Sequence, residues 1–492
     1  MNDPQLIWAL LGLPVAGAIV CLLLPRPRVV LKTIVWLSAA HTLLALEAAR
    51  RVLAAGPLRA AYDWLYIDAF SAFHLVVLGL VYLGSSLFAG VYFGAMHGQH
   101  RFTPRVARRF GAPWLASLFA MTLVLVSNNL GVMWVGMEST TLLTAFLISL
   151  YTSRLSLEAM WKYLIICSVG IAFAFMGTLL VAAAVENPAG VESGGLLWTS
   201  LMDPATRLDP VLMKIAFAFL IVGYGTKAGL APVHSWLPDA HSQAPAPVSA
   251  MFSGFLLNAA LYCIMRYVPL VPHALGNDFA SDLLVVFGTL SVLVAAAFIV
   301  FQTDAKRLLA YHSVEHLGII ALGFGLGPIG AFAALFHTLN HSLCKSLAFF
   351  AVGRLGQRFG THDMHAIGGV LRSDRLWGVA LLGSLLALIG VAPFAVFMSE
   401  YQVLRAAAAM NAWIALVLFL LGSGVIFVSA LRHVIDMVYG DARIASAASG
   451  DGFAMTAMVG ATLAALLVLG IWLPGPLTEI IRQAAAIVAG SV

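Results

Sequence analysis

Three ionisable side chains stand deep inside apolar stretches of this chain. Glu138 comes eight residues into an otherwise uncharged segment, Lys227 lies near the end of another, and Glu400 follows the phrase PFAVFMS. A charged group at bilayer depth is costly and usually marks an ion pathway. We predict that Glu138 and Lys227 pair and exchange protons, with Glu400 as a terminal proton site. The alternatives are a loop-edge glutamate at 138 and a helix-start carboxylate at 400.

Histidines and further charges recur at helical spacing in two other apolar stretches. These two groups are His312, Glu315 and His316, and His337, His341 and Lys345. Each group falls on one helical face, which must meet protein or water because a polar stripe facing lipid is costly. Imidazole exchanges protons near neutral pH, so we interpret both as parts of a hydrated proton path. For both groups the alternative is a structural hydrogen-bond network. A metal site is a further alternative for His312, Glu315 and His316, although this group lacks one more ligand at fixed spacing.

Glycine and proline interrupt the helix that carries Lys227. Gly229 and Pro232 free backbone groups, which the membrane interior tolerates only where protein or water satisfies them. A polar segment follows, and we expect it either to gate the break or to cap it. Its ionisable residues are His234, Asp239 and His241. The same phrase returns 161 residues later at Gly390-Val-Ala-Pro393. Paired broken helices indicate an inverted-repeat transporter.

The composition is that of an integral membrane protein. The 492 residues are 61% hydrophobic and 10% charged, with mean hydropathy +0.95, whereas a soluble domain is about 25% charged. We predict an all-α polytopic protein of about fourteen transmembrane helices. They fall near 5–24, 30–49, 68–94, 113–127, 130–151, 160–184, 210–230, 246–267, 281–301, 306–324, 328–352, 376–407 with a break, 411–437 and 453–474. The tail TEIIRQAAAIVAG suggests a short interfacial helix.

Basic residues are distributed unevenly between the predicted loops. Loops after odd-numbered helices hold seventeen Lys and Arg, including Lys306, Arg354 and Arg443, against six after even-numbered ones, including Arg266. This bias places both termini on the outer side. The loop 185–209 agrees, because its charges are mostly acidic: Glu186, Glu192, Asp203 and Asp209 against Arg207. No cleavable signal is expected, since residues 1–24 begin with Asp3, lack a basic start and run into the first helix.

The sequence contains no recognisable cofactor motif. Four cysteines lie far apart in apolar runs: Cys21, Cys167, Cys263 and Cys344. No CxxC pair suggests zinc or an iron–sulfur cluster, and no glycine-rich phosphate loop follows a strand. We therefore expect buried, unreactive thiols and no cofactor of any kind.

Two stretches carry a family resemblance. GTKAGLAPVHSWLPDAHSQAPAPVSA and TDAKRLLAYHSVEHLG resemble the proton-pumping antiporter-like subunits of respiratory complex I, Mrp antiporters and group 4 [NiFe]-hydrogenases. HSWLPDAHSQAPAPVSAMFSGFLLNAALYCIMR and MWKYLIICSVGIAFAFMG most resemble the F-type membrane component of hydrogenase-4. The resemblance implies family roles for Glu138, Lys227 and Glu400. It implies the same for His337, His341 and Lys345. Asn258 stands where some complex I paralogues have a lysine, so the central relay would run through water or through the 312–316 group.

The resemblance also implies an organisation and a function. We expect N-terminal helices in 1–112, five-helix repeats in 113–267 and 281–437, related by inversion, and a last helix with its tail in 453–492. The chain would translocate protons in a bacterial inner membrane, driven by electron transfer in partner subunits. Those partners would be membrane-arm subunits and a peripheral iron–sulfur, hydrogenase-like or quinone-reductase module; whether the chain has catalytic activity of its own stays open. The alternatives are an Mrp-type sodium/proton antiporter subunit and an unrelated small-solute carrier.

Overall fold

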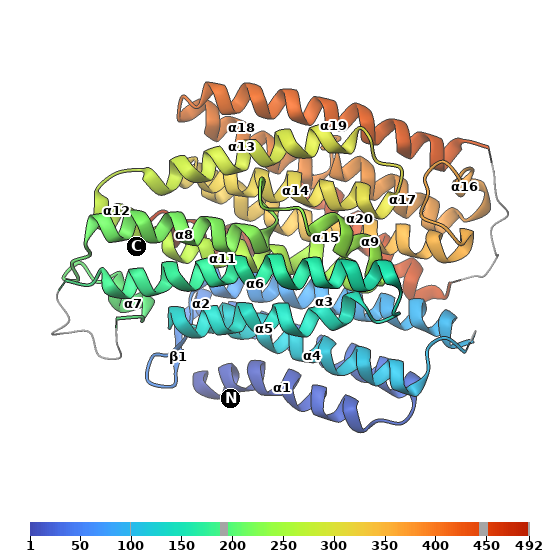
Figure 1. Ribbon diagram of the computed structural model, residues 1–492, viewed down its shortest axis with the longest axis horizontal. Coiled ribbons are helices and arrows are strands. Elements are labelled where there is room, and N and C mark those ends of the chain that lie inside the picture. Colours follow the sequence, from blue (N-terminus) through green and yellow to red (C-terminus); the bar gives the residue numbers. More distant parts are fainter. Residues whose placement is uncertain (99, 187–194, 442–450, 491–492) are drawn as a thin grey trace.

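The chain folds into a bundle of long helices that run nearly side by side (Figure 1). The computed structural model describes residues 1–98, 100–186, 195–441 and 451–490. Glu192 and Arg443, used above for the topology, lie outside these ranges. The long helices are α1 (Asp3–Leu23), α2 (Pro27–Ala55), α3 (Ala69–Gly98), α4 (Pro104–Val126), α5 (Leu130–Ile148), α6 (Arg154–Ala183), α8 (Pro210–Ala228), α11 (Leu257–Tyr267), α13 (Phe279–Ile299), α14 (Ala305–Phe324), α15 (Gly327–Phe359), α17 (Arg375–Leu388), α18 (Ala395–Ala409), α19 (Trp413–Tyr439), α20 (Phe453–Ile471) and α21 (Gly475–Val488).

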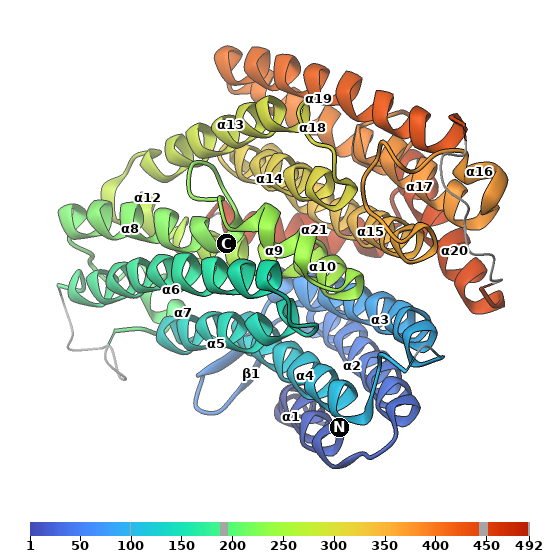
Figure 2. The same cartoon turned by 45° about the vertical axis from the view of Figure 1, so that its right-hand side comes forward.

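Short elements join or extend these helices. They are α7 (Trp198–Leu201), α9 (Leu237–Gln243), α10 (Ala246–Met251), the π-helix η2 (Phe252–Leu256), α12 (Leu270–Leu275) and α16 (Val370–Ser373). Strands β1 (Leu58–Ala60) and β2 (Leu65–Ile67) form an antiparallel hairpin in which Leu58 pairs with Ile67. In Figure 2, α1 lies at one end of the bundle and α19 at the other, with α14 and α15 nearer α19.

Every predicted membrane segment is helical in the structure, which confirms the all-α polytopic fold. Eleven helices in the described part of the chain are long and apolar enough to cross a membrane. The three remaining predicted segments are α14, α15 and the pair α17–α18. The first two carry buried charged residues, and the pair is broken in the middle. The predicted tail helix forms as α21, and it packs against α3 and α15 with Ile481 fully buried.

Both predicted helix breaks are present. Gly229 ends α8 and Gly390 follows α17, and both adopt the left-handed conformation, with φ of +78° and +70°. The peptide bonds before Pro232 and Pro393 are both cis. A β-carbon on Gly390 would lie 2.3 Å from the Glu400 carboxylate, so only glycine lets that carboxylate lie against the break. The inverted relation between the two halves, and the domain boundaries, stay predictions.

Both termini lie at the same end of the bundle (Figure 1). Asp3 pairs with Arg51 at the end of α2, and Gly490 lines the same cavity as Gly56. The side of the membrane that this end faces stays a prediction from the charge bias.

Two arginines that the topology argument assigned to loops lie inside helices and are buried. Arg266 of α11 forms a two-pronged ion pair with Asp68, with N···O distances of 2.6 and 2.8 Å. Arg354 of α15 pairs with Asp451 at 2.6 Å. Burial opposes ionisation of Asp451, but hydrogen bonds from Arg354 and Trp377 outweigh it and hold the pKa of Asp451 below its ordinary value. These pairs join distant parts of the chain and do not mark loop positions.

Helices α6 and α8 cross closely because small residues line their contact. A β-carbon on Gly223 would lie 2.4 Å from the backbone nitrogen of Ala174. We expect Gly223→Ala to lower the free energy of unfolding by about 1–3 kcal/mol, because two helix backbones must separate. Gly424→Ala is the matched control, since nothing lies within 4 Å of its added β-carbon. Thermal unfolding in detergent measures both, and equal stability of the two variants would contradict the packing assigned here.

Candidate functional site

Lys227 is fully buried near the end of α8, just before the helix break. Its Nζ donates hydrogen bonds to Thr141 Oγ1 of α5 at 2.9 Å and to Tyr163 Oη of α6 at 2.5 Å. The ammonium also lies 4.5 Å from the centroid of the Tyr163 ring. Tyr163 Oη in turn shares a 2.7 Å hydrogen bond with Thr144. Hydroxyl groups both accept and donate, so Lys227 can pass a proton into this network without a large movement.

Glu138 lies on α5, half-buried, one turn before the threonine that contacts Lys227. Its Oε1 accepts a hydrogen bond from Ser168 Oγ at 3.0 Å, and its buried Oε2 has no hydrogen-bond partner. Among the described residues, no ion pair within 4.0 Å joins Glu138 to Lys227. Glu138 therefore lies one turn along α5 from Thr141, which accepts a hydrogen bond from Lys227 of α8, and the two charged groups are not in direct contact.

The phenol of Tyr163 gives a test of this hydroxyl network. Tyr163→Phe removes the short hydrogen bond to Lys227 and keeps the ring. Because a hydrogen bond to a charged group contributes about 1.5–3 kcal/mol, we expect proton translocation to slow by about ten- to a hundredfold. Tyr267→Phe is the control, as Tyr267 is equally buried and shares a 2.8 Å hydrogen bond with Thr178. Equal slowing in both variants, measured as the initial rate of vesicle acidification, would argue against a role for Tyr163.

A hydrogen-bonded series of histidines connects α14, α15 and α18. His312 Nδ1 lies 2.8 Å from Glu315 Oε2 on the same helix. His316 Nδ1 lies 2.9 Å from His337 Nε2 across the α14–α15 contact, and His337 Nδ1 lies 2.9 Å from Ser399 Oγ of α18. All of these histidines are fully buried. The His337 ring is hydrogen-bonded at both nitrogens, so it can accept a proton on one side and release it on the other, between α14 and α18, whereas Nε2 of His312 and of His316 has no hydrogen-bond partner.

His341, Lys345 and Glu400 lie beside this series of histidines. The His341 ring centroid lies 5.2 Å from that of His316, and neither His341 nitrogen has a hydrogen-bond partner. Lys345 is fully buried and donates from Nζ to the Leu309 carbonyl. Glu400 follows Ser399 on α18, and one of its carboxylate oxygens lies within 4.8 Å of nitrogens of His316 and His337. The structure thus brings together all the residues predicted from the two spaced groups, and Glu400 with them.

His241 lies between the surroundings of Lys227 and those of Lys345. It is fully buried in α9, and its ring centroid lies 6.1 Å from that of Phe252 and 5.2 Å from that of Phe349. Phe252 in turn contacts the Tyr163 ring, and Lys345 Nζ lies 5.4 Å from the Phe349 ring. Both His241 nitrogens lack a hydrogen-bond partner. The polar segment at the first break therefore places an imidazole between two phenyl rings, one of which contacts Tyr163 and the other Lys345.

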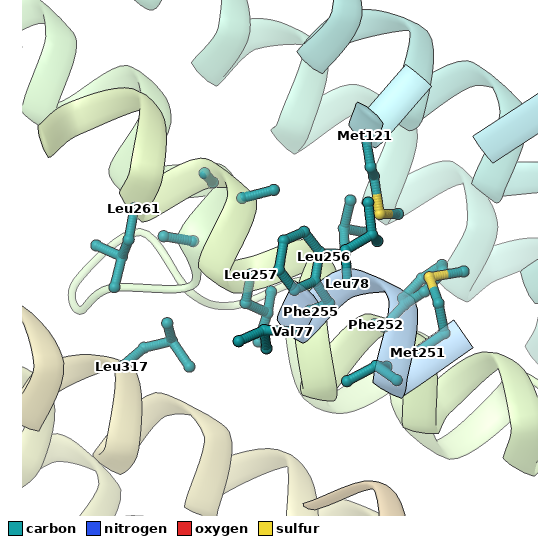
Figure 3. Packing of buried hydrophobic residues seen from close by; sticks show 14 of the residues in the cluster. Val77, Leu78, Met121, Met251, Phe252, Phe255, Leu256, Leu257, Leu261 and Leu317 are labelled. Carbon is teal, nitrogen blue, oxygen red and sulfur yellow. The ribbon is translucent and has the colours of Figure 1, made fainter. Parts of the chain in front are cut away.

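The other side of this central region is apolar. Figure 3 shows Phe255, Leu256 and Leu257 beside Val77 and Leu78 of α3. Toward α14 and α15 the same segment is polar, where Ser253 hydrogen-bonds Ser313 at 2.8 Å. Asn258, which replaces a possible lysine, donates to Ser342 at 3.1 Å. Water needs polar partners, so any hydrated connection runs on the α14–α15 side.

The other ionisable residues of the broken segment, Asp239 and His234, contact neighbouring helices. Asp239 is partly exposed and forms ion pairs with Lys162 of α6 and Arg307 of α14, with N···O distances of 3.0 and 2.6 Å. His234 is half-buried and lies edge-on to the stacked rings of Phe298 and Tyr311. Asp239 thus ties α9 to two helices at the end of the break, a geometry that suits holding the segment in place.

Among the residues that the structure describes, two groups of three side chains have metal-ligand chemistry. They are His312, Glu315 and His316, and His316, His337 and Glu400. In each group, however, two ligand atoms already face each other at hydrogen-bond distance: 2.8 Å from His312 to Glu315 and 2.9 Å from His316 to His337. This arrangement favours proton exchange between neighbours over coordination of an ion between them.

Comparison with known proteins identifies the family. The model of the NADH:quinone oxidoreductase/Mrp antiporter transmembrane family matches residues 127–426, which contain every residue of the predicted path. The chain belongs to this family. A hydrogenase-4 component F homolog of Methylacidiphilum infernorum is 40% identical over 353 residues, covering 71% of this chain and 74% of that protein.

Two solved structures share the fold over nearly the whole chain. A chain of the membrane-bound sulfane sulfur reductase, an archaeal respiratory membrane complex, superposes with a TM-score of 0.84 at 24% identity, over 99% of this chain and 98% of that one. A chain of respiratory complex I from Thermus thermophilus with bound aureothin gives a TM-score of 0.75 at 27% identity, over 95% and 97%.

Sequence reasoning missed several polar residues of this candidate site. Thr141, Tyr163 and Ser168 have no charge and sit in apolar helices, so no pattern singles them out. Lys306 was assigned to a loop, yet it is buried in the first turn of α14, and its Nζ donates to the Ser242 and Ala244 carbonyls at the end of α9. The one signal for Lys306 was its position directly before an apolar helix.

Proposed function

We propose that this chain is the proton-translocating membrane subunit of a hydrogenase-4-like or complex I-like oxidoreductase. The observation that carries the proposal is the buried row of proton-exchanging groups, from Glu138 and Lys227 at one flank to Glu400 at the other. Such groups are rare in membrane interiors and usually mark proton relays. The family and the 40% identity to a hydrogenase-4 component F homolog support the same function.

In the proposed cycle, electron transfer in a partner subunit changes the charge near Glu138. That field brings Glu138 closer to Lys227 or separates the two. An approaching carboxylate favours the ammonium form, and its withdrawal favours release of the proton. The released proton moves through the hydroxyls of Tyr163 and Thr144 and past His241. It then passes to Lys345 and the histidine series, and reaches Glu400 beside the second break.

The partners are membrane-arm subunits and a peripheral iron–sulfur module that holds the electron-transfer centres. The location is a bacterial inner membrane, with both termini outside. An Mrp-type antiporter subunit is the alternative, and the identity to the component F homolog does not favour it.

Purification of the tagged chain from native membranes tests the proposal. We expect an oxidoreductase large subunit and iron–sulfur subunits to copurify, and inverted vesicles to acidify when the electron donor is added. Acidification should be independent of sodium. Copurification with small antiporter subunits alone, and pH changes that follow sodium gradients without electron transfer, would contradict it.

A further inference from the structure

A cavity with arginines at one end opens between α1, α4 and α5. Its volume is about 780 Å³. Its wall includes Ala18, Ile19 and Leu22 of α1, Arg105, Arg108, Arg109, Ala112, Pro113 and Ala116 of α4, and Leu143, Phe146 and Leu150 from α5 onward. The proposed proton path uses none of these residues.

The α4 wall is a single helical face with a sharp change of chemistry. Its members follow the spacing i, i+3, i+4, i+7, i+8 and i+11, which keeps them on one side of the helix. The first three are arginines in the first two turns. The next three, Ala112, Pro113 and Ala116, are small, so the cavity continues along the helix as a shallow trough.

The three arginines lack partners of opposite charge. Within the described ranges, Arg105, Arg108 and Arg109 take part in no ion pair, and the cavity wall contains no Asp or Glu. All three side chains are exposed. Like charges three and four residues apart on a helix repel one another, and an anion between them removes that cost. Guanidinium groups bind phosphate oxygens through paired hydrogen bonds.

The trough beyond the arginines is apolar and open at the side. Ile19, Leu22 and Phe146 are 56%, 55% and 65% exposed, and they lie on helices that are long and apolar enough to cross a membrane. A free phosphate would use the arginines but leave these side chains unpaired. A phospholipid satisfies both parts, because its headgroup carries the negative charge and its acyl chain covers apolar surface at membrane depth.

We propose that this cavity binds one anionic phospholipid of the leaflet at the arginine-rich end, with its phosphate on Arg105, Arg108 and Arg109. One acyl chain lies along Ala112 and Ala116 between α1 and α5. The lipid fixes α1 against α4 and α5, and α5 carries Glu138. This inference does not depend on the proposed function.

Native mass spectrometry of the full chain in detergent, titrated with phosphatidylglycerol, tests the proposal. We expect saturable binding of one lipid, with phosphatidylcholine much weaker. Replacing all three arginines with glutamine should weaken binding about a hundredfold, since each basic residue contributes about 1 kcal/mol to the attraction of anionic lipid. Ala116→Phe, which fills the trough and keeps every charge, should also prevent binding. It keeps the test decisive if the triple variant folds poorly.

The matched control replaces Arg28, Arg372 and Arg375 with glutamine. These arginines, in the first turn of α2, in α16 and at the start of α17, are exposed and do not line the cavity. This control variant should bind phosphatidylglycerol as the unmodified chain does. Equal weakening in the control would show general surface charge and overturn the proposal. So would full displacement of the lipid by equimolar inorganic phosphate, or unchanged binding by Ala116→Phe. In the purified complex, the proposal would also be overturned if the cysteine of Arg109→Cys crosslinked to a partner subunit and the cavity held no lipid.

Discussion

Replacing Lys227 with methionine is expected to stop proton translocation while the complex still assembles. Methionine matches the length of the lysine stem and leaves no unpaired charge in the buried site. The hydrogen bond between Tyr163 and Thr144 remains. Loss of a proton-transfer group usually slows the transfer by about a hundredfold or more. Acidification of inverted vesicles, driven by the electron donor and normalised to assembled complex, measures the effect.

Lys214→Met is the control for this substitution, because Lys214 lies on the same helix, is exposed, and sits 5.1 Å from the Phe279 ring. It should leave translocation unchanged. If Lys227→Met assembled normally and acidified vesicles at the original rate, the hydroxyl-lined site around Lys227 would have no part in proton movement.

The second large effect is expected for His337→Gln. The His337 ring bridges His316 on α14 and Ser399 on α18, at 2.9 Å on each side. Glutamine keeps a donor and an acceptor but cannot take up a proton and release it from the opposite side. Translocation should fall by about a hundredfold or more. Initial acidification rates again measure the change.

A double variant strengthens this prediction. If Lys227 and His337 act in series on one path, the double variant is no slower than the slower single variant, because effects of groups that act as a unit are not additive. His41→Gln is the matched control, since His41 is fully buried and hydrogen-bonds Thr122 at 2.9 Å outside the path. A double variant slower than the unmodified chain by the product of both effects would show that the two residues contribute independently and do not act in series.

The helical segments were predictable from apolar length, but their ends depended on capping and pairing. The fourth predicted helix starts near 113, whereas α4 begins at Pro104, because Thr103 caps it and Arg105 reads as a loop residue. Likewise α15 runs to Phe359, past Arg354, since that arginine pairs with Asp451. The short helix α9 was missed because its polar residues resemble a loop.

The site was predictable as a set of residues and not as a geometry. The cost of charge in the membrane points to Lys227 and Glu400 from sequence alone, and helical spacing groups the histidines correctly. Which side chains meet across helices cannot be derived from spacing within one helix. The contact of Lys227 with Tyr163 and that of His316 with His337 both join segments distant in the chain.

Difference infrared spectroscopy of the reconstituted complex tests the central claim most directly, that protons arriving at Glu400 have passed Lys227. Electron transfer should change the carboxyl band of Glu400, identified by its absence in Glu400→Gln. In Lys227→Met, where Glu400 is intact, the account predicts that this band no longer responds. A Glu400 band that still changes fully during turnover of Lys227→Met would contradict a proton path between the two residues.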